Sequence, residues 1–476
     1  MRFRPAPQGY PELIRHWRTW KLAARGGCLA ICLLHGCGRS AVPPAPSQAA
    51  SGSDEKVTES HSDNASSPTV TGPSSPDLPP NRDPSQLRQA ALAAFQAGDT
   101  QTADRLVRAA LLAAPDDTET IFLMALVLGQ QNRFAEAIKM LDDLAELDPS
   151  IRNPAMGQTA EWMVFQGQWR EAEKRYRTLL EEVDETSLIH RRLAQLFLRQ
   201  GRRQDAIHHL SQLCQRGNIE EVELRALLGL DYPFSLAAGV EELEPIGPLG
   251  SARYEISQGN QDAAIAKLAD SDQPGETALL GRLYAQKRDL TALSQWIDQL
   301  PNAVENKSEY GFAMGVAEAE RGNHRVAVAH FCDAILGDQT DKDAYQELSE
   351  SLQEIGAIDQ AQEALRRAGL IEQTQILGNA MMQSDTRDLQ QMTTLIDLLE
   401  QLRRPLEALA WRVVRLIYGG DSLPKSDVKR QLAEINTARL RYLQNEQPAA
   451  NVSFLLCGVD PNALDEDDPA SDDTTQ

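Results

Sequence analysis

Apolar residues recur along the middle of the chain at the spacing of amphipathic helices. Two examples of this spacing, close to i, i+3, i+4 and i+7, are Ile121, Met124, Ala125 and Leu128, and then Leu193, Ala194 and Phe197. The spacing places these side chains on one stripe of each helix, and such a stripe has to be buried against another helix. The middle of the chain is therefore predicted to be a stack of helices.

A repeated turn pattern divides these helices into pairs. A turn residue and an alanine five positions later recur at a nearly constant interval, as Gly98 with Ala103, Asn132 with Ala137, Gly167 with Ala172, and Gly201 with Ala206. Gly or Asn suits a left-handed residue at the end of a helix. The small Ala lets the second helix of each pair lie close to the first. Pro115 and Pro149 end the first two copies, because proline breaks a helix.

The same pattern returns in the second half of the chain. Its turn residues are Gly259, Arg288, Gly322 and Gly356, and the last three are separated by the same regular interval. A looser copy follows, with its turn at Arg403. Between Gly201 and Gly259 the phase is lost, and prolines interrupt the sequence. Residues 219–274 are therefore expected to be an irregular helical linker between two repeat blocks, or a special site where the superhelix bends.

This turn pattern, with its interval of about 34 residues, resembles that of the tetratricopeptide repeat (TPR) family. The resemblance extends from about Pro84 to Tyr418, with off-pattern stretches near 219–250 and 370–388. It implies an all-α fold, a right-handed superhelical solenoid of about nine helix-turn-helix hairpins. It also implies a concave groove that holds a peptide, a helix or another protein. Family members of this shape are scaffolds and not catalysts.

The resemblance and the composition together predict seven segments. They are a signal peptide (1–36), a disordered Ser/Pro-rich linker (37–83), a first TPR block (84–218), the irregular linker (219–274), a second TPR block with degenerate repeats (275–418), a capping helix (419–450) and an acidic tail (451–476). Within the last two, residues 425–445 are predicted to be one solitary helix and residues 451–458 a short extended piece. The linker has one Leu and no aromatic residue between 38 and 84, and the chain from 460 onward carries seven acidic residues and no basic one.

The N-terminus has the pattern of an export signal. Six basic residues precede the apolar run from Gly26 to Leu34, which is too short to span a bilayer. The run continues into Leu34-His35-Gly36-Cys37-Gly38, which resembles the lipobox of bacterial lipoproteins, although His35 departs from its usual second position. The resemblance implies acylation of Cys37 and a lipid anchor at the outer membrane or periplasmic face of a bacterial envelope. Cleavage as an ordinary signal peptide and retention as an uncleaved anchor are the alternatives.

Charge and cysteine content limit the remaining classes. The net charge of −22 argues against a nucleic-acid partner, which requires a basic stripe. After the signal peptide and Cys37, only Cys214, Cys332 and Cys457 remain, and their wide spacing and odd number imply no disulfide framework. Cys214 and Cys332 lie on helical patterns and are expected to be core residues.

The TPR resemblance assigns the groove to first-helix positions just outside the packing residues. The proposed partner-binding residues are Arg88, Phe122, Leu126, Phe165, Arg191, Gln195 and Arg199, and the same positions in the second block include Glu309, Phe312 and Val316. A partner with carboxylates or an amphipathic helix would fit the first block. The alternative is that the apolar residues only pack between first helices and that the charges are solvated.

The sequence contains only weak candidates for a catalytic or metal-binding site. Gly420-Asp421-Ser422-Leu423 spells a lipase and esterase motif, but the chain that follows it is too short for such a domain, and the last histidine is His330. His208 and His209, and likewise His324 and His330, lack the i, i+4 spacing of a metal site and are expected to be surface or capping residues. No catalytic residue, metal or cofactor is predicted. The expected function is a non-catalytic protein–protein interaction scaffold tethered to the cell envelope. The alternative is an accessory or regulatory subunit of an envelope enzyme or of a secretion or assembly complex.

Overall fold

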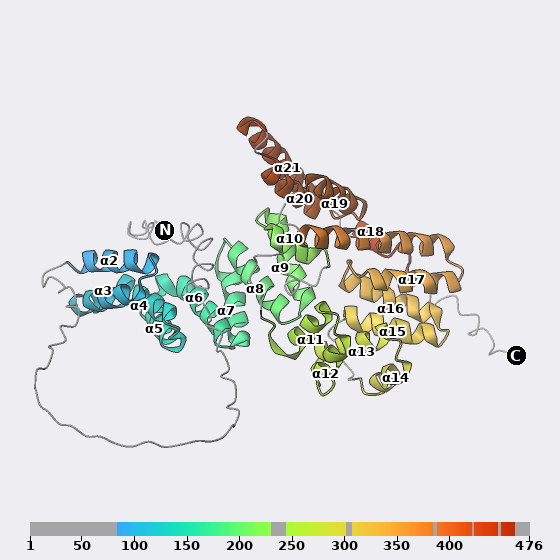
Figure 1. The fold of residues 1–476 in the computed structure, drawn as a ribbon, viewed down its shortest axis with the longest axis horizontal. Helices are drawn as coiled ribbons and strands as arrows, with labels where there is room; N and C mark the ends of the chain where they lie inside the picture. Colours follow the sequence, from blue (N-terminus) through green and yellow to red (C-terminus); the bar gives the residue numbers. More distant parts are fainter. Residues whose placement is uncertain are drawn as a thin grey trace, which may run out of the picture. The chain divides into compact units, whose positions relative to one another are not determined.

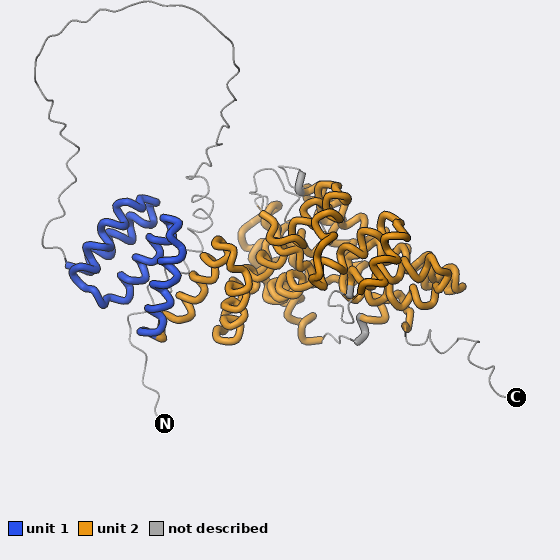
Figure 2. Tube along the Cα trace, turned by 90° about the horizontal axis from the view of Figure 1, so that it is seen from below, with its two compact units in different colours: residues 1–148 blue, residues 149–476 orange. Residues whose placement is uncertain are grey.

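The computed structural model describes residues 83–229, 244–300, 307–383, 388–420, 423–445 and 449–461. The chain divides into two compact units, residues 1–148 and 149–476 (Figure 2). Within the described ranges every regular element is a helix, which confirms the predicted all-α fold (Figure 1). The signal peptide, Cys37 and the Ser/Pro-rich linker lie outside these ranges.

The described part of unit 1, residues 83–148, contains two helical hairpins that pack on each other. Its helices are α2 (Pro84–Gln96), α3 (Thr100–Ala113), α4 (Thr118–Gln130) and α5 (Phe134–Leu147). α2 packs on α3, α4 packs on α5, and α3 and α4 hold the two hairpins together. The apolar ladder of α4 is buried as the sequence predicts, with Met124, Ala125 and Leu128 all in the core.

Unit 2 contains seven hairpins within its described residues. After a short 3-10 turn, η1 (Pro149–Ile151), they are α6 (Arg152–Phe165) with α7 (Trp169–Glu182), α8 (Ser187–Arg199) with α9 (Arg203–Arg216), α11 (Gly247–Ser257) with α12 (Gln261–Leu268), α13 (Pro274–Gln286) with α14 (Leu290–Asp298), α15 (Lys307–Glu320) with α16 (His324–Gly337), α17 (Lys342–Glu354) with α18 (Ile358–Gln383), and α19 (Leu389–Gln401) with α20 (Pro405–Gly419). With the two of unit 1 they make nine, the number that the turn pattern predicts.

One backbone motif closes every hairpin. All nine predicted turn residues have positive φ, including the non-glycine residues Asn132 (60°), Arg288 (52°) and Arg403 (53°). In each turn the N–H of the next residue donates to the carbonyl five positions earlier, as Asp99 does to Ala94 (3.0 Å). This is the Schellman hydrogen bond, which satisfies a carbonyl that the helix end leaves unpaired. The repeat is therefore built from a local backbone requirement.

The residue five positions after each turn is buried, as close packing of the hairpin requires. Eight of these residues are Ala, from Ala103 to Ala408, and the ninth, after Arg288, is Leu293; none is more than 1% exposed. The predicted core positions of Cys214 and Cys332 are also confirmed, because both side chains are buried and free.

In the part of the chain that the structure describes, three helices stand outside the hairpins. α10 (Glu221–Leu227) follows α9, and α21 (Lys425–Asn445) has the bounds of the predicted solitary helix. α22 (Ala449–Leu455) corrects the expectation of an extended piece at residues 451–458. The helix packs against α16, and Leu456, Cys457 and Val459 just beyond it are buried in the core of the second block. Tertiary packing therefore overrides the β-branched and aromatic character of this short segment.

Unit 2 is more closed than a solenoid in which each repeat contacts only its neighbours. α20 packs against both α9 and α10 (Figure 1). The Arg404 guanidinium donates to the Leu227 carbonyl (2.6 Å), and the Tyr418 hydroxyl donates to the Glu221 carboxylate (2.8 Å). Arg439 on α21 donates to the Gln215 carbonyl. Helices that are far apart in the sequence are thus fastened together.

Candidate functional site

The predicted groove residues of unit 1 lie on one surface, which we call the first-helix face. Arg88 and Leu92 are one turn apart on α2, and Glu119, Phe122 and Leu126 follow the i, i+3, i+7 spacing on α4. The Arg88 guanidinium joins the two helices, with ion pairs to Asp117 (2.6 Å) and Glu119 (2.7 Å). Leu92, Phe122 and Leu126 are half-buried, so each presents part of an apolar side chain to solvent.

The predicted groove arginines of unit 2 are bonded to other parts of the chain, whereas Phe165 is exposed. Arg191, Gln195 and Arg199 lie on one face of α8, one turn apart. Arg191 pairs with the Glu223 carboxylate and donates to the Asn218 carbonyl (2.7 Å), while Arg199 donates to the Glu244 carbonyl (2.8 Å). Phe165 ends α6 and is 66% exposed. The arginines of this face therefore hold the segment that follows α9.

Acidic side chains of the chain itself already pair with Arg88 and Arg191, whereas Arg199 donates to a backbone carbonyl. Arg192, which lies next to Arg191, pairs with Glu161 of α6 at 2.7 Å, in the same way that Arg88 pairs with acids of α4. An arginine held by a neighbouring carboxylate offers less to the carboxylate of a partner. The geometry therefore favours a partner that presents apolar residues over one that presents carboxylates.

Three of the predicted groove residues of the second block are buried, and for these three the prediction is wrong. Phe312 is 2% exposed and Val316 is fully buried, both in the core that α15 shares with α16, and Glu309 is buried as well. The cause is the close approach of α16, because a Cβ on Gly315 would lie 2.5 Å from the Phe331 ring. Residues at these positions therefore stabilise the fold and do not line an open groove.

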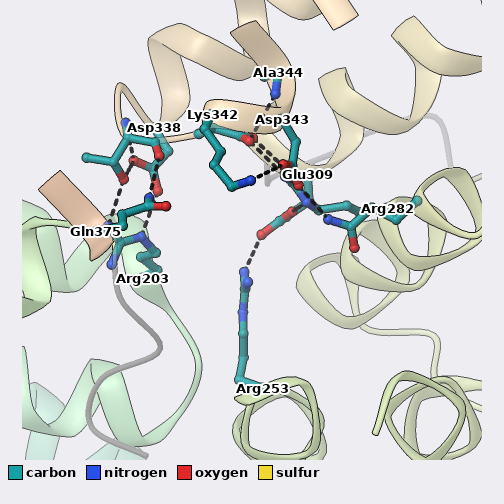
Figure 3. Close-up of polar contacts among 12 residues, drawn as sticks. Arg203, Arg253, Arg282, Glu309, Asp338, Lys342, Asp343, Ala344 and Gln375 are labelled. Atoms are coloured by element: carbon teal, nitrogen blue, oxygen red, sulfur yellow. Dashed lines mark hydrogen bonds and ion pairs between the residues drawn. The ribbon is translucent and has the colours of Figure 1, made fainter. Parts of the chain in front are cut away.

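Glu309 belongs to a buried ion network that the sequence did not predict. The network consists of Arg203, Arg253, Arg282, Lys342, Glu309, Asp338, Asp341 and Asp343 (Figure 3). Arg203 starts α9, Arg253 lies on α11, Arg282 on α13 and Glu309 on α15. The remaining residues lie in or just after the connection from α16 to α17. Five parts of unit 2 therefore meet here, although their residues have no common spacing in the sequence.

Each cation of the network has an acidic partner. Arg203 contacts Asp338 at 2.6 Å, and Arg282 contacts Asp341 at 2.5 Å and Glu309 at 3.3 Å. Glu309 also pairs with Arg253, and Lys342 lies 3.6 Å from Asp343. Four cations and four anions balance, and so the cavity of about 300 Å³ beside them has no excess charge for a phosphate or a cation. The network is therefore suited to holding these elements of unit 2 together.

The pKa values within the network follow from these contacts. Burial acts to raise the pKa of Asp338, but the Arg203 charge and hydrogen bonds from Thr340 outweigh it and lower this pKa to about 2. Burial raises the pKa of Asp341 above its ordinary value, with Arg282 opposing. For Arg282, burial acts to lower the pKa, but Asp341 and Glu309 outweigh it and raise the pKa. Asp338 is thus the carboxylate of the network that the fold holds most clearly in its charged form at neutral pH.

A second buried polar contact corrects the expectation for His209. Its Nδ1 lies 2.8 Å from Nδ1 of His190, and both side chains are buried, whereas His208 is exposed as expected. Burial lowers the pKa of each ring to about 4, and the nearby Arg216 and His208 add to this for His190. Both rings are therefore neutral at pH 7, and one donates a hydrogen bond to the other. Sequence spacing could not reveal the pair, because the two residues lie on different helices.

Several other features bear on chemistry. Across the described ranges, no three His, Cys, Asp or Glu side chains gather as they would around a metal ion. None of the helices there combines the length and the apolar character needed to cross a membrane. Asp421 and Ser422 of the esterase-like motif, like Cys37, fall outside the part of the chain that the structure describes.

The turn geometry and the comparison with known families agree. Residues 94–156 match the tetratricopeptide repeat family. This match starts in α2, includes α3 to α5 and ends in α6, and it supports the resemblance drawn from the turn pattern. The other hairpins share the same left-handed turn residue and a buried residue five positions later, which is Ala in all of them except at Leu293. No curated protein sequence matches the chain.

Solved structures also match parts of the chain at low sequence identity. A tetratricopeptide repeat protein from Parabacteroides merdae is 14% identical and covers 56% of this chain and 98% of its own, with a TM-score of 0.28. The TPR2AB domain of yeast Sti1, solved in a complex described as TPR2AB-domain:pHSP90, is 12% identical over 68% of this chain and 98% of its own, with a TM-score of 0.27. The APC/C hetero-tetramer Cut9–Hcn1 is 14% identical over 79% and 83%, with a TM-score of 0.25.

Proposed function

We propose that the chain is a non-catalytic protein–protein interaction scaffold, tethered to the cell envelope, that binds a partner protein through the first-helix face of unit 1. The observation that carries the binding surface is the set of half-exposed apolar residues on that face, Leu92, Phe122 and Leu126, beside an arginine that already has acidic partners. The match to the tetratricopeptide repeat family supports protein binding in general.

The chemistry of this face favours an amphipathic helix as the partner segment. Leu92 on α2, and Phe122 and Leu126 on α4, are half-buried apolar side chains on two helices that contact each other, which suits a helix that lays its apolar side into a groove. Arg88 holds α2 and α4 together, so this surface exists before the partner arrives. A preformed surface reduces the entropy that binding has to overcome.

The test is a quantitative capture experiment with the full chain and two matched variants. Phe122→Ser combined with Leu126→Ser is expected to lower partner recovery from envelope extracts at least tenfold, because losing two interface side chains costs about 1.5–3 kcal/mol. The control is Leu112→Ser on α3, a second helix of the same unit, where the side chain is 86% exposed. Equal recovery by both variants, with unchanged thermal unfolding, would rule out this surface.

The tether rests on the signal and lipobox-like sequence alone. Acylation of Cys37 would anchor the chain, and the Ser/Pro-rich segment after it would hold the repeats away from the membrane surface. Metabolic labelling with a palmitate analogue tests this. Cys37→Ser is expected to abolish the label and to move the protein out of the membrane fraction, whereas Cys457→Ser, at a buried thiol, is expected to change neither. A Cys37→Ser protein that labels as strongly as wild type would refute the lipid anchor.

A further inference from the structure

The C-terminal helix α22 occupies a site of unusual construction on the second block. Phe454 lies between two guanidinium groups, 3.8 Å from that of Arg367 and 4.0 Å from that of Arg403. The Tyr345 hydroxyl donates to the Leu455 carbonyl (3.0 Å). Tyr345, Arg367 and Arg403 come from α17, α18 and the turn before α20. We call these three residues the Phe454 site.

The main chain at the end of α22 leaves the Leu455 carbonyl available to the Tyr345 hydroxyl. The helix ends in a Schellman turn, in which Gly458 donates to the Ser453 carbonyl (2.8 Å) and Cys457 to the Phe454 carbonyl (3.2 Å). Leu455 comes next in this last turn; the helix leaves its carbonyl without a backbone partner, and the Cys457 Sγ contacts it weakly at 3.9 Å. The Tyr345 hydroxyl replaces that partner. The site therefore recognises a helix end as well as an aromatic side chain.

Arg367 has the properties of a ligand-binding residue. It is 2% exposed, and within the described chain its Nε and Nη2 atoms have no hydrogen-bond partner. Glu363 lies 3.9 Å away, beyond hydrogen-bonding distance. A buried guanidinium with free donors is costly when its only role is structural. Here its face contacts Phe454, and a cation over an aromatic ring is a recognition contact.

The repeat pattern explains why such a site exists at this position. The turn residues Gly356 and Arg403 are farther apart than the regular interval of the repeat, and α18 continues to Gln383. The hairpin of α19 and α20 therefore comes later in the sequence than the regular interval would place it. Leu456, Cys457 and Val459 enter the same core cluster as Leu370 and Ile371 of α18 and Leu398 of α19. The segment after α22 thus fills space at an interruption of the repeat.

We propose that the Phe454 site is an exchangeable recognition site for a short helical segment that carries an aromatic residue followed by apolar residues, and that α22 is its occupant within the chain. The contact surface of α22 is small: among the residues of this segment whose side chains the structure describes, Phe454 and Leu455 are half-buried, and Leu456, Cys457 and Val459 just after the helix are buried. An element held by so few side chains opens at a lower free energy than the helices beneath it. This site is separate from the surface proposed for partner binding in unit 1.

The direct test adds a labelled peptide with the sequence of residues 449–461, under reducing conditions, to full-length protein. Phe454→Ala in the full chain is expected to loosen α22, so that fluorescence anisotropy shows the peptide binding at least tenfold more tightly than to wild type. The control Val452→Ala changes an exposed side chain of the same helix and is expected to behave as wild type. Adding Arg367→Met to Phe454→Ala is expected to abolish binding. A folded Phe454→Ala protein that does not bind the peptide would overturn the proposal.

A second measurement uses wild-type protein and does not depend on a variant that folds. Hydrogen exchange at the Cys457, Gly458 and Val459 amides, which are hydrogen-bonded in the α22 turn, is expected to be at least a hundredfold faster than at core amides of α16 and α17. Excess free peptide is expected to accelerate it further by competing for the site. Exchange at the same rate as the core amides would show that α22 is a permanent part of the fold and would contradict the proposal.

Discussion

Replacing Arg203 by Met tests whether the buried ion network holds unit 2 together. Arg203 contacts Asp338 at 2.6 Å, donates to Thr340 at 3.0 Å and donates to the Ala226 carbonyl at 2.9 Å. These three contacts join the start of α9 to the connection before α17 and to α10. Methionine keeps much of the apolar stem and removes all three hydrogen bonds.

The expected loss follows from the burial of Asp338. Its side chain is 12% exposed and that of Arg203 is 18% exposed, so removing the arginine leaves a buried carboxylate without its cation. Breaking a buried pair from one side costs about 3–5 kcal/mol of unfolding free energy. The matched control is Arg133→Met, at an exposed pair with Glu136 in unit 1, where solvent screens the charges and the expected loss is small.

A double-mutant cycle separates the pair from its surroundings. Urea unfolding of Arg203→Met, Asp338→Asn and the combined variant is expected to give a coupling energy of about 2–3 kcal/mol, because the double variant leaves no uncompensated charge. A coupling below about 0.5 kcal/mol, or equal losses at Arg203 and Arg133, would show that the network does not fasten these elements and would refute the reasoning.

Two further predictions concern packing and protonation. Gly315→Ala is expected to lower the unfolding free energy by up to about 2 kcal/mol, because its Cβ would lie 2.5 Å from the Phe331 ring; Gly369→Ala, where nothing lies within 4 Å, is expected to raise it by about 0.5–1 kcal/mol. Thermal unfolding of both variants checks the opposite signs. Stability is also expected to fall as the pH is lowered from 6.5 to 4, because the unfolded state binds protons at His190 and His209 that the folded state excludes. Above pH 6.5 the two rings are uncharged in both the folded and the unfolded state, so no stability is lost to their protonation. The double variant His190→Leu and His209→Leu is expected to flatten the pH profile in that window, and a profile unchanged by it would contradict the assignment.

The sequence predicted the hairpins well because the information that specifies them is local. A left-handed turn residue and a small residue five positions later are both requirements of one turn and one close contact, and each can be read within a short stretch of sequence. The spacing also located the turns at Arg288 and Arg403, where the residue type alone gives no signal, and both have positive φ. The arginine side chains at these two turns contact other helices: Arg288 pairs with Glu347 of α17, and Arg403 contacts Phe454 of α22.

The sequence could not predict contacts between parts of the chain that share no period. Arg203 and Asp338 are 135 residues apart, and nothing near either residue identifies the other. The error at Phe312 and Val316 has the same origin, because family positions indicate a groove only where neighbouring helices stay apart. At α15 the glycines let α16 approach too closely. The extended piece expected near Phe454 is helical because Tyr345 and two arginines hold it in that form.

The non-neighbour contacts of unit 2 also decide which surface is available for binding. Arg191 and Arg199 hold the segment after α9, Arg404 and Tyr418 hold α10, and the ion network joins α9 to the start of α17. Polar side chains that would face the groove of an open solenoid are therefore bonded to other parts of the same chain. On the first-helix face of unit 1 the ion pairs join only adjacent helices, and apolar side chains remain half-exposed beside them. A partner that depends on apolar contact therefore has more to gain at Phe122 and Leu126 than at the arginines of α8.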